Sequence, residues 1–225
     1  MPRKITGAAF LSLDGVMQAP GGPDEDTTGG FEHGGWFAAL FEEAIGHQVD
    51  TVFKPPFDLL LGRRTYDIFA AHWPALADDG EIGTLFAGIS KYVLTSSDEP
   101  LAWQGSHALA DIDAVAALKE NGGPDLVIQG SSTLYPPLLA RGLIDRLVLM
   151  VAPVVLGSGK RLFGANTDGS TGAGAWKLVE QRQTPGGTLM STYEPDGQVK
   201  IADFQLPDPT PEELARQQRM REGTW

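Results

Sequence analysis

The sequence predicts an α/β fold built around a largely parallel sheet, and two observations carry that prediction. Short apolar runs alternate along the chain with longer segments whose apolar residues recur at helical spacing. This alternation is typical of parallel strands linked by helices that cover the sheet. Near the C-terminus, two strand-like runs flank the turn signal Thr184-Pro185-Gly186. We therefore expect a three-layer αβα sandwich with a C-terminal antiparallel hairpin, an arrangement common at the edge of a mostly parallel sheet.

The elements follow in order from this pattern. The first strand is expected over residues 5–13, and a glycine-, proline- and acid-rich loop follows over 16–35. A loop of that length in a compact domain is usually a functional lid or partly disordered. Further strands are expected at residues 59–61, 91–94, 107–110, 126–129 and 147–151, helices at 36–49, 65–72, 81–90, 112–120 and 133–141, and the hairpin strands at 176–183 and 187–194.

The chain is long enough for one domain with a sizeable core, which we expect over residues 1–195. Residues 196–225 form a polar tail. Thr210 followed by Pro211 and Glu213 predicts the start of a short helix there. The tail is expected to be an exposed appendage or a dimer contact.

Composition narrows the function. The chain has no cysteine, which excludes disulfides and thiolate metal sites. Its formal net charge of −12 argues against a nucleic-acid partner. No apolar run approaches the roughly 20 residues needed to span a membrane. The N-terminus fits a core strand better than a signal peptide, so we expect a cytoplasmic protein with no membrane association.

Three predicted strand ends carry groups that suit a phosphate. Glycine lets backbone N–H groups approach a ligand closely, and arginine supplies forked donors. Ligands of open α/β sheets bind at the carboxyl ends of the strands, where these groups would converge. They are Gly62, Arg63, Arg64 and Thr65 after the second strand, Thr95, Ser96 and Ser97 after the third, and Gly130, Ser131, Ser132 and Thr133 after the strand at 126–129.

Other nucleotide and metal motifs fail. A P-loop reading of residues 154–161 requires glycine where Val154 stands and serine or threonine where Arg161 stands. The dinucleotide fingerprint fails because Leu162 occupies its last glycine position. The histidines lack metal-binding spacing and no nucleophile elbow occurs, so we expect neither a metal site nor a serine hydrolase.

The chain resembles the dihydrofolate reductase-like superfamily over roughly residues 4–195. Within it, the chain is more similar to the C-terminal reductase domain of the bifunctional riboflavin-biosynthesis deaminase-reductase than to true folate reductases. The segments that carry the resemblance are FLSLDGVM (10–17), LGRRTYD (61–67), YVLTSS (92–97), QGSSTLYPPLL (129–139) and APVVLGSGKRLF (152–163).

The resemblance implies NADPH as cofactor and a homodimer. It places the cofactor phosphates at the second strand end, the adenosine 2′-phosphate after the third, the pyrophosphate at the helix that follows residue 129, and the nicotinamide near the first strand and its turn. The cofactor residues that it implies are Ala9, Gly15, Val16, Met17, Gly62, Arg63, Arg64, Thr65, Leu94, Thr95, Ser96, Gly130, Ser131, Ser132 and Leu134. Two of these residues also have a purely structural alternative, in which Ser96 only ends a strand and Arg64 is only a solvated helix residue.

The same resemblance implies a substrate side lined by Trp36, Val155, Gly157 and Gly159. The carboxylate that grips the pterin in folate reductases aligns with His33, which becomes a candidate proton donor near neutral pH. The alternative for His33 is a solvated loop residue. Asp14 is a second catalytic candidate, although it also suits closure of the turn at 13–16.

These inferences predict an NADPH-dependent reductase of a small heterocycle, either a pterin or a phosphorylated ribosylaminopyrimidinone of the riboflavin type. Lys160 and Arg161 would then face the substrate phosphate or remain surface charges. One alternative is a non-catalytic nucleotide-binding protein of the same fold. Another is a flavin- or deazaflavin-dependent reductase.

Overall fold

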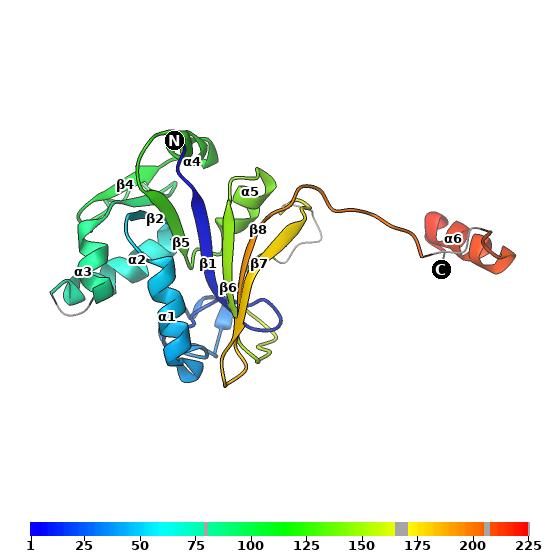
Figure 1. The fold of residues 1–225 in the computed structure, drawn as a ribbon, viewed down its shortest axis with the longest axis horizontal. Helices are drawn as coiled ribbons and strands as arrows, with labels where there is room; N and C mark the ends of the chain where they lie inside the picture. Colours follow the sequence, from blue (N-terminus) through cyan, green and yellow to red (C-terminus); the bar gives the residue numbers. More distant parts are fainter. Residues whose placement is uncertain (79–80, 165–170, 205–207, 225) are drawn as a thin grey trace.

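The computed structural model describes residues 1–78, 81–164, 171–204 and 208–224. Its centre is an eight-stranded sheet in the order β4-β3-β2-β5-β1-β6-β8-β7 (Figure 1). The strands are β1 (Ile5–Leu11), β2 (Phe57–Gly62), β3 (Lys91–Leu94), β4 (Ser106–Leu109), β5 (Asp125–Gln129), β6 (Arg146–Val151), β7 (Trp176–Gln183) and β8 (Leu189–Pro195). The helices are α1 (Glu43–Val52), α2 (Arg63–His72), α3 (Glu81–Gly88), α4 (Ile112–Glu120), α5 (Tyr135–Ala140) and α6 (Pro211–Glu222), with 3-10 turns at Thr28–Gly30, Ala38–Leu40 and Trp73–Leu76.

Strands β1 to β6 pair in parallel, as predicted. β1 lies at the centre, with Ile5 opposite Leu126 of β5 and Thr6 opposite Arg146 of β6. β8 pairs with β6 antiparallel, and β7 pairs antiparallel with β8. The mostly parallel sheet with a C-terminal antiparallel hairpin is therefore confirmed, and the carboxyl ends of β2, β3 and β5 lie at one edge.

Side chains of β2 show why helices cover both faces. Leu60 packs into a cluster that includes residues of α4 and α5. Leu59 and Leu61 point the other way and pack into a cluster with residues of α1, α2 and α3. Successive side chains of a strand face opposite sides, so a continuous apolar run fits a sheet buried on both faces. The three-layer αβα architecture is confirmed.

The predicted helix over residues 36–49 is wrong in its first half. Residues 38–40 form a 3-10 turn, and α1 starts only at Glu43. Trp36 donates from Nε1 to the carbonyl of Gln18 at 2.8 Å. Phe37 is buried against Phe10, with ring centroids 4.2 Å apart. These tertiary contacts hold both aromatic side chains, whose spacing alone resembled an amphipathic helix.

The C-terminal helix forms where its cap predicts. Thr210 Oγ1 accepts a hydrogen bond from the N–H of Glu213, and α6 begins at Pro211. In Figure 1, α6 lies apart from the sheet. The division into a domain at 1–195 and a tail stays a prediction. Among the described residues, no helix combines the length and apolar character needed to cross a membrane.

Candidate functional site

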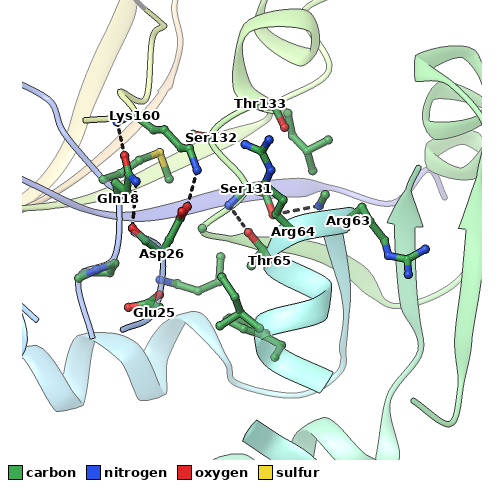
Figure 2. Close-up of a pocket in the computed structure, with 18 of the residues that line it drawn as sticks. Gln18, Glu25, Asp26, Arg63, Arg64, Thr65, Ser131, Ser132, Thr133 and Lys160 are labelled. Atoms are coloured by element: carbon green, nitrogen blue, oxygen red, sulfur yellow. Dashed lines mark hydrogen bonds and ion pairs between the residues drawn. The ribbon is translucent and has the colours of Figure 1, made fainter. Parts of the chain in front are cut away.

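A cavity of about 1000 Å³ opens at the carboxyl edge of the sheet. Two facing sets of residues matter for its chemistry (Figure 2). The strand-end wall comprises residues at the carboxyl ends of β2, β3 and β5 and in the segments that follow them, namely Gly62, Arg63, Arg64, Thr65, Leu94, Thr95, Ser96, Ser97, Gly130, Ser131, Ser132, Thr133 and Leu134. The loop wall comprises Met17, Gln18, Glu25, Asp26 and Lys160.

The strand-end wall offers unpaired backbone donors. The first turn of α2 has no side-chain cap, because its N-cap residue is Gly62. The first N–H groups of a helix lack intrahelical partners, and the helix dipole favours an anion there. The backbone N–H groups of Ser132 and Thr133 donate to no other described residue. This wall is therefore suited to bind phosphate oxygens.

Two hydroxyl groups hold this wall together. Thr65 Oγ1 accepts the N–H of Ser131 at 2.9 Å, and Ser131 Oγ accepts the N–H of Gly62 at 3.0 Å. Gly130 has φ +69°, and a Cβ there would lie 3.1 Å from Thr65 Cγ2. The β2–α2 and β5–α5 turns thus depend on each other. Thr65 and Ser131 join the turns through contacts within the chain.

The two arginines of this wall differ in their surroundings. Arg63 Nε donates to Asp67 at 2.8 Å, and its terminal nitrogens contact Glu99. Arg64 is exposed and forms no ion pair within the described part of the chain. In Figure 2, the two side chains extend in different directions. Arg64 is therefore the cation that is available for a ligand.

The loop wall is held together by an internal network. Lys160 pairs with Asp26 and donates to Thr28 Oγ1 at 2.7 Å. Gln18 accepts the backbone N–H of Lys160 at 3.0 Å and donates to the carbonyls of Asp26 and Thr28. Burial opposes the ionisation of Asp26, but the hydrogen bonds from Lys160 and Thr28 outweigh it and lower its pKa. Asp26 and Lys160 thus neutralise each other.

Among the carboxyl groups on the described cavity surface, Glu25 is the one that neither forms an ion pair nor caps a helix. Asp111 caps α4 by accepting the N–H of Ala114 at 2.8 Å, and Asp26 is paired with Lys160. Glu25 is half-buried, forms no ion pair with a described residue, and accepts the N–H of Gly21 at 2.7 Å. Burial raises the pKa of Glu25, despite the opposing backbone hydrogen bonds. A carboxyl group in such a place can hold a proton for a bound molecule.

The structure keeps the two candidate catalytic residues away from the cavity surface. His33 is exposed, and its ring packs edge-on against Phe31 at 5.8 Å. Asp14 accepts hydrogen bonds from Ser12 Oγ and the N–H groups of Leu156 and Gly157. The Ser12 contact, aided by those N–H groups, holds the pKa of Asp14 well below its usual value. These contacts fit the turn-closing alternative for Asp14, and neither side chain reaches the cavity.

The expected substrate residues Trp36, Val155, Gly157 and Gly159 also lie off the cavity surface. Val155 is 68% exposed. Gly159 serves packing, since a Cβ there would lie 2.6 Å from Val16 Cγ1. Of the expected cofactor residues, Ala9, Gly15 and Val16 do not line the cavity, while Met17 and all those of the strand-end wall do.

Arg161, a candidate for the substrate phosphate, is held elsewhere. It pairs with Asp14 and donates to the carbonyl of Gly157 at 3.0 Å. Within the described residues, no cluster of three or more His, Asp or Glu side chains could hold a metal ion.

Sequence reasoning missed Gln18, Glu25 and Asp26 as cavity residues. The acid-rich composition of the loop at 16–35 was the available signal. Composition could not show which carboxyl group of that loop turns inward.

Comparison with known proteins identifies the class. The model of the RibD C-terminal domain family matches residues 3–190, so the chain belongs to this family. The predicted relationship to riboflavin-type reductases is confirmed, and membership supports a reductase role. The chain is also 31% identical over 121 residues to "Uncharacterized protein YyaP" of Bacillus subtilis (strain 168). That match covers 52% of this chain and 61% of YyaP.

Solved structures share the fold. A putative riboflavin biosynthesis protein from Shewanella sp. PV-4 matches with a TM-score of 0.56 and 19% identity, over 87% of this chain and 99% of that one. A pyrimidine reductase-like protein from Corynebacterium diphtheriae matches with a TM-score of 0.54 and 13% identity, over 89% of this chain and 93% of that one. Dihydrofolate reductase from Enterococcus faecalis, in complex with NADP(H) and RAB-propyl, matches with a TM-score of 0.53 and 14% identity, over 86% of this chain and 96% of that one. The predicted dihydrofolate reductase-like fold is confirmed.

Proposed function

We propose that this protein is an NADPH-dependent reductase that transfers a hydride to a small conjugated heterocycle. One observation carries the proposal. A single cavity has unpaired backbone N–H donors on one wall and, on the other, a carboxyl group that has no ion pair and whose pKa is raised by burial. Membership of the RibD C-terminal domain family supports the reductase class.

The strand-end wall fits a dinucleotide. Arg64, the first turn of α2 and the N–H groups of Ser132 and Thr133 would hold the pyrophosphate. The hydroxyl groups of Thr95 and Ser96 would lie towards the adenosine ribose. When bound there, NADPH supplies the hydride, and the chain contributes placement and exclusion of water.

Glu25 is the proposed proton donor to the substrate. Its raised pKa keeps a larger protonated fraction near neutral pH than an exposed glutamate has. The protonated carboxyl group would donate to a ring nitrogen or carbonyl oxygen of the heterocycle.

The charges of the loop wall favour a substrate without a phosphate. Asp26 neutralises Lys160, and Asp14 holds Arg161. A substrate phosphate would therefore meet no free cation on this wall and would lie near Glu25. An unphosphorylated pterin or pyrimidine fits better than the phosphorylated riboflavin precursor.

The first test is a titration of NADPH and NADH followed by tryptophan fluorescence. Trp73 lines the cavity and supplies the signal. We expect micromolar NADPH binding and, with bound NADPH, oxidation at 340 nm on addition of a dihydropterin or an unphosphorylated pyrimidine. Absence of binding by either dinucleotide would contradict the proposal. An absorbance spectrum with a bound flavin would instead favour the flavin-dependent alternative.

A non-catalytic nucleotide-binding protein is the second candidate. It is favoured by one observation: His33 and Asp14, the residues expected to supply acid chemistry, lie off the cavity surface. NADPH binding without turnover on any heterocycle would support it.

The homodimer and the cytoplasmic location stay predictions from the resemblance and the sequence. Light scattering on the full chain tests the first: a mass near twice 24.0 kDa is expected, and a monomer at micromolar concentration would contradict it.

A further inference from the structure

We infer that Glu99 is a specificity-determining residue that competes with the 2′-phosphate of NADPH for Arg63, and so weakens discrimination against NADH. The inference rests on the proposed function, because it concerns the cofactor half of the same cavity. Its basis is the set of contacts around the Arg63 guanidinium.

All three nitrogens of that guanidinium are in use. Nε donates to Asp67 at 2.8 Å, one terminal nitrogen donates to the Glu99 carbonyl at 3.0 Å, and the other contacts the Glu99 carboxylate at 3.1 Å. Arg63 lines the cavity together with Thr95, Ser96 and Ser97. A phosphate that reaches this corner therefore finds its cation already paired.

The two carboxylates differ in how they are held. Asp67 lies one turn along α2 from Arg63, which fixes the Nε contact within one helix. Glu99 reaches Arg63 from the segment after β3, and its side chain is 79% exposed. Exposed ion pairs stabilise proteins by only about 0–1 kcal/mol, so Glu99 is the partner that a ligand can displace.

The segment after β3 keeps Glu99 close to Arg63. Thr95 Oγ1 accepts the N–H of Ser97 at 3.0 Å, and Ser97 Oγ accepts the N–H of Glu99 at 3.2 Å. These bonds bend the chain back towards α2. The bound Glu99 carbonyl keeps the residue in place even when its carboxylate moves.

The Glu99 carboxylate should weaken the binding of NADPH and favour the binding of NADH. A 2′-phosphate carries close to two negative charges, so it must displace the Glu99 carboxylate or lie beside it against repulsion. A ribose 2′-hydroxyl instead donates well to a carboxylate, as acidic residues do when they select NAD in other dinucleotide sites. Arg63 favours NADPH, and Glu99 offsets part of that preference.

The test compares Glu99→Gln with Asp98→Asn, a matched control that removes one charge from the neighbouring position. Dissociation constants are measured for NADPH, NADH, adenosine 2′,5′-bisphosphate and AMP. For Glu99→Gln, we expect about threefold to tenfold tighter binding of the two ligands with a 2′-phosphate and no tightening of the other two. Asp98→Asn should change the ratios between these dissociation constants by less than Glu99→Gln does.

Arg63→Ala decides whether the effect passes through the guanidinium. The gain from Glu99→Gln should vanish in the Arg63→Ala background. An unchanged ratio in Glu99→Gln, an equal shift for all four ligands, or a gain that persists without Arg63 would overturn the inference. Binding of the bisphosphate with the expected ratios but no NADPH oxidation would leave the inference standing and remove the proposed reductase function. No binding of any of the four ligands would overturn both.

Discussion

The two walls of the cavity contain similar polar groups but leave different ones without a partner. On the strand-end wall, Thr65 and Ser131 bind each other and leave Arg64 and several backbone N–H groups free. On the loop wall, Lys160 and Asp26 bind each other and leave a single acid, Glu25. Each wall is internally satisfied apart from the groups that suit a ligand. The groups proposed for anion binding and for proton donation therefore lie on opposite walls of one cavity.

The largest expected effect is the loss of turnover when the proposed proton donor of the loop wall, Glu25, is replaced. Glu25→Gln keeps the shape of the side chain but removes the acidic proton of the carboxyl group. We expect turnover to fall about 10²- to 10⁴-fold, with the NADPH dissociation constant unchanged. In the wild type, turnover should fall as pH rises through the raised pKa of Glu25, because the protonated form is lost. The variant's remaining activity should lack that pH step.

Glu32→Gln is the matched control, since Glu32 is exposed on the same loop and away from the cavity surface. Equal turnover in Glu25→Gln and wild type would remove Glu25 from the chemistry.

The next largest effect is expected from a substitution that distorts the turn after β5 in the strand-end wall. Gly130→Val places a β-branched side chain at φ +69° and 3.1 Å from Thr65 Cγ2. We expect a loss of about 1–3 kcal/mol in the free energy of unfolding and at least tenfold weaker NADPH binding. Chemical denaturation and the fluorescence titration measure the two quantities. Gly122→Val serves as control, because a Cβ there meets nothing within 4 Å; an equal loss in both variants would count against the proposed role of this turn.

A third change tests how far the loop wall depends on its internal pair. Lys160→Met leaves Asp26, whose side chain is 13% exposed, without its cation. We expect destabilisation of about 1–3 kcal/mol. Asp26 has a lowered pKa when folded, so its contribution is present above the unfolded pKa and is lost as pH falls through the folded value. The gap between wild type and variant should therefore shrink in acid.

The double variant Asp26→Asn with Lys160→Met closes the cycle for that pair. It should recover part of the stability lost in Lys160→Met. Strict additivity of the two single changes would show that the pair does not couple.

The smallest effect distinguishes the two arginines. Arg64→Ala should weaken NADPH and NADH alike by about 1 kcal/mol or slightly more, because both share the pyrophosphate. Arg63→Ala should weaken NADPH more than NADH. The fluorescence titration gives both ratios. Equal behaviour of the two variants would contradict the division of roles inferred from their contacts.

Local pattern was sufficient for several elements. β3 (Lys91–Leu94) and α4 (Ile112–Glu120) have the bounds that their apolar runs predict, and α6 starts after its Thr210 cap. α4 and α6 begin at caps formed by near neighbours in the chain, whereas β3 also needs its ladders to β2 and β4. The prediction of a helix at 36–49 was wrong in its first half because residues outside this segment, such as Gln18 through its carbonyl, hold the first side chains in place.

The sequence by itself determined the class of fold and the edge of the sheet at which the cavity opens. Alternation of strands and helices requires parallel strands, and parallel strands bring their carboxyl ends together. Only the tertiary structure decided which polar groups remain free. Asp26 and Lys160 are 134 residues apart, yet their pairing leaves Glu25 as the carboxyl group of the described cavity surface that has no cation and caps no helix. Burial and ion pairing depend on three-dimensional neighbours, and the local pattern of residues along the chain does not reveal which residues those are.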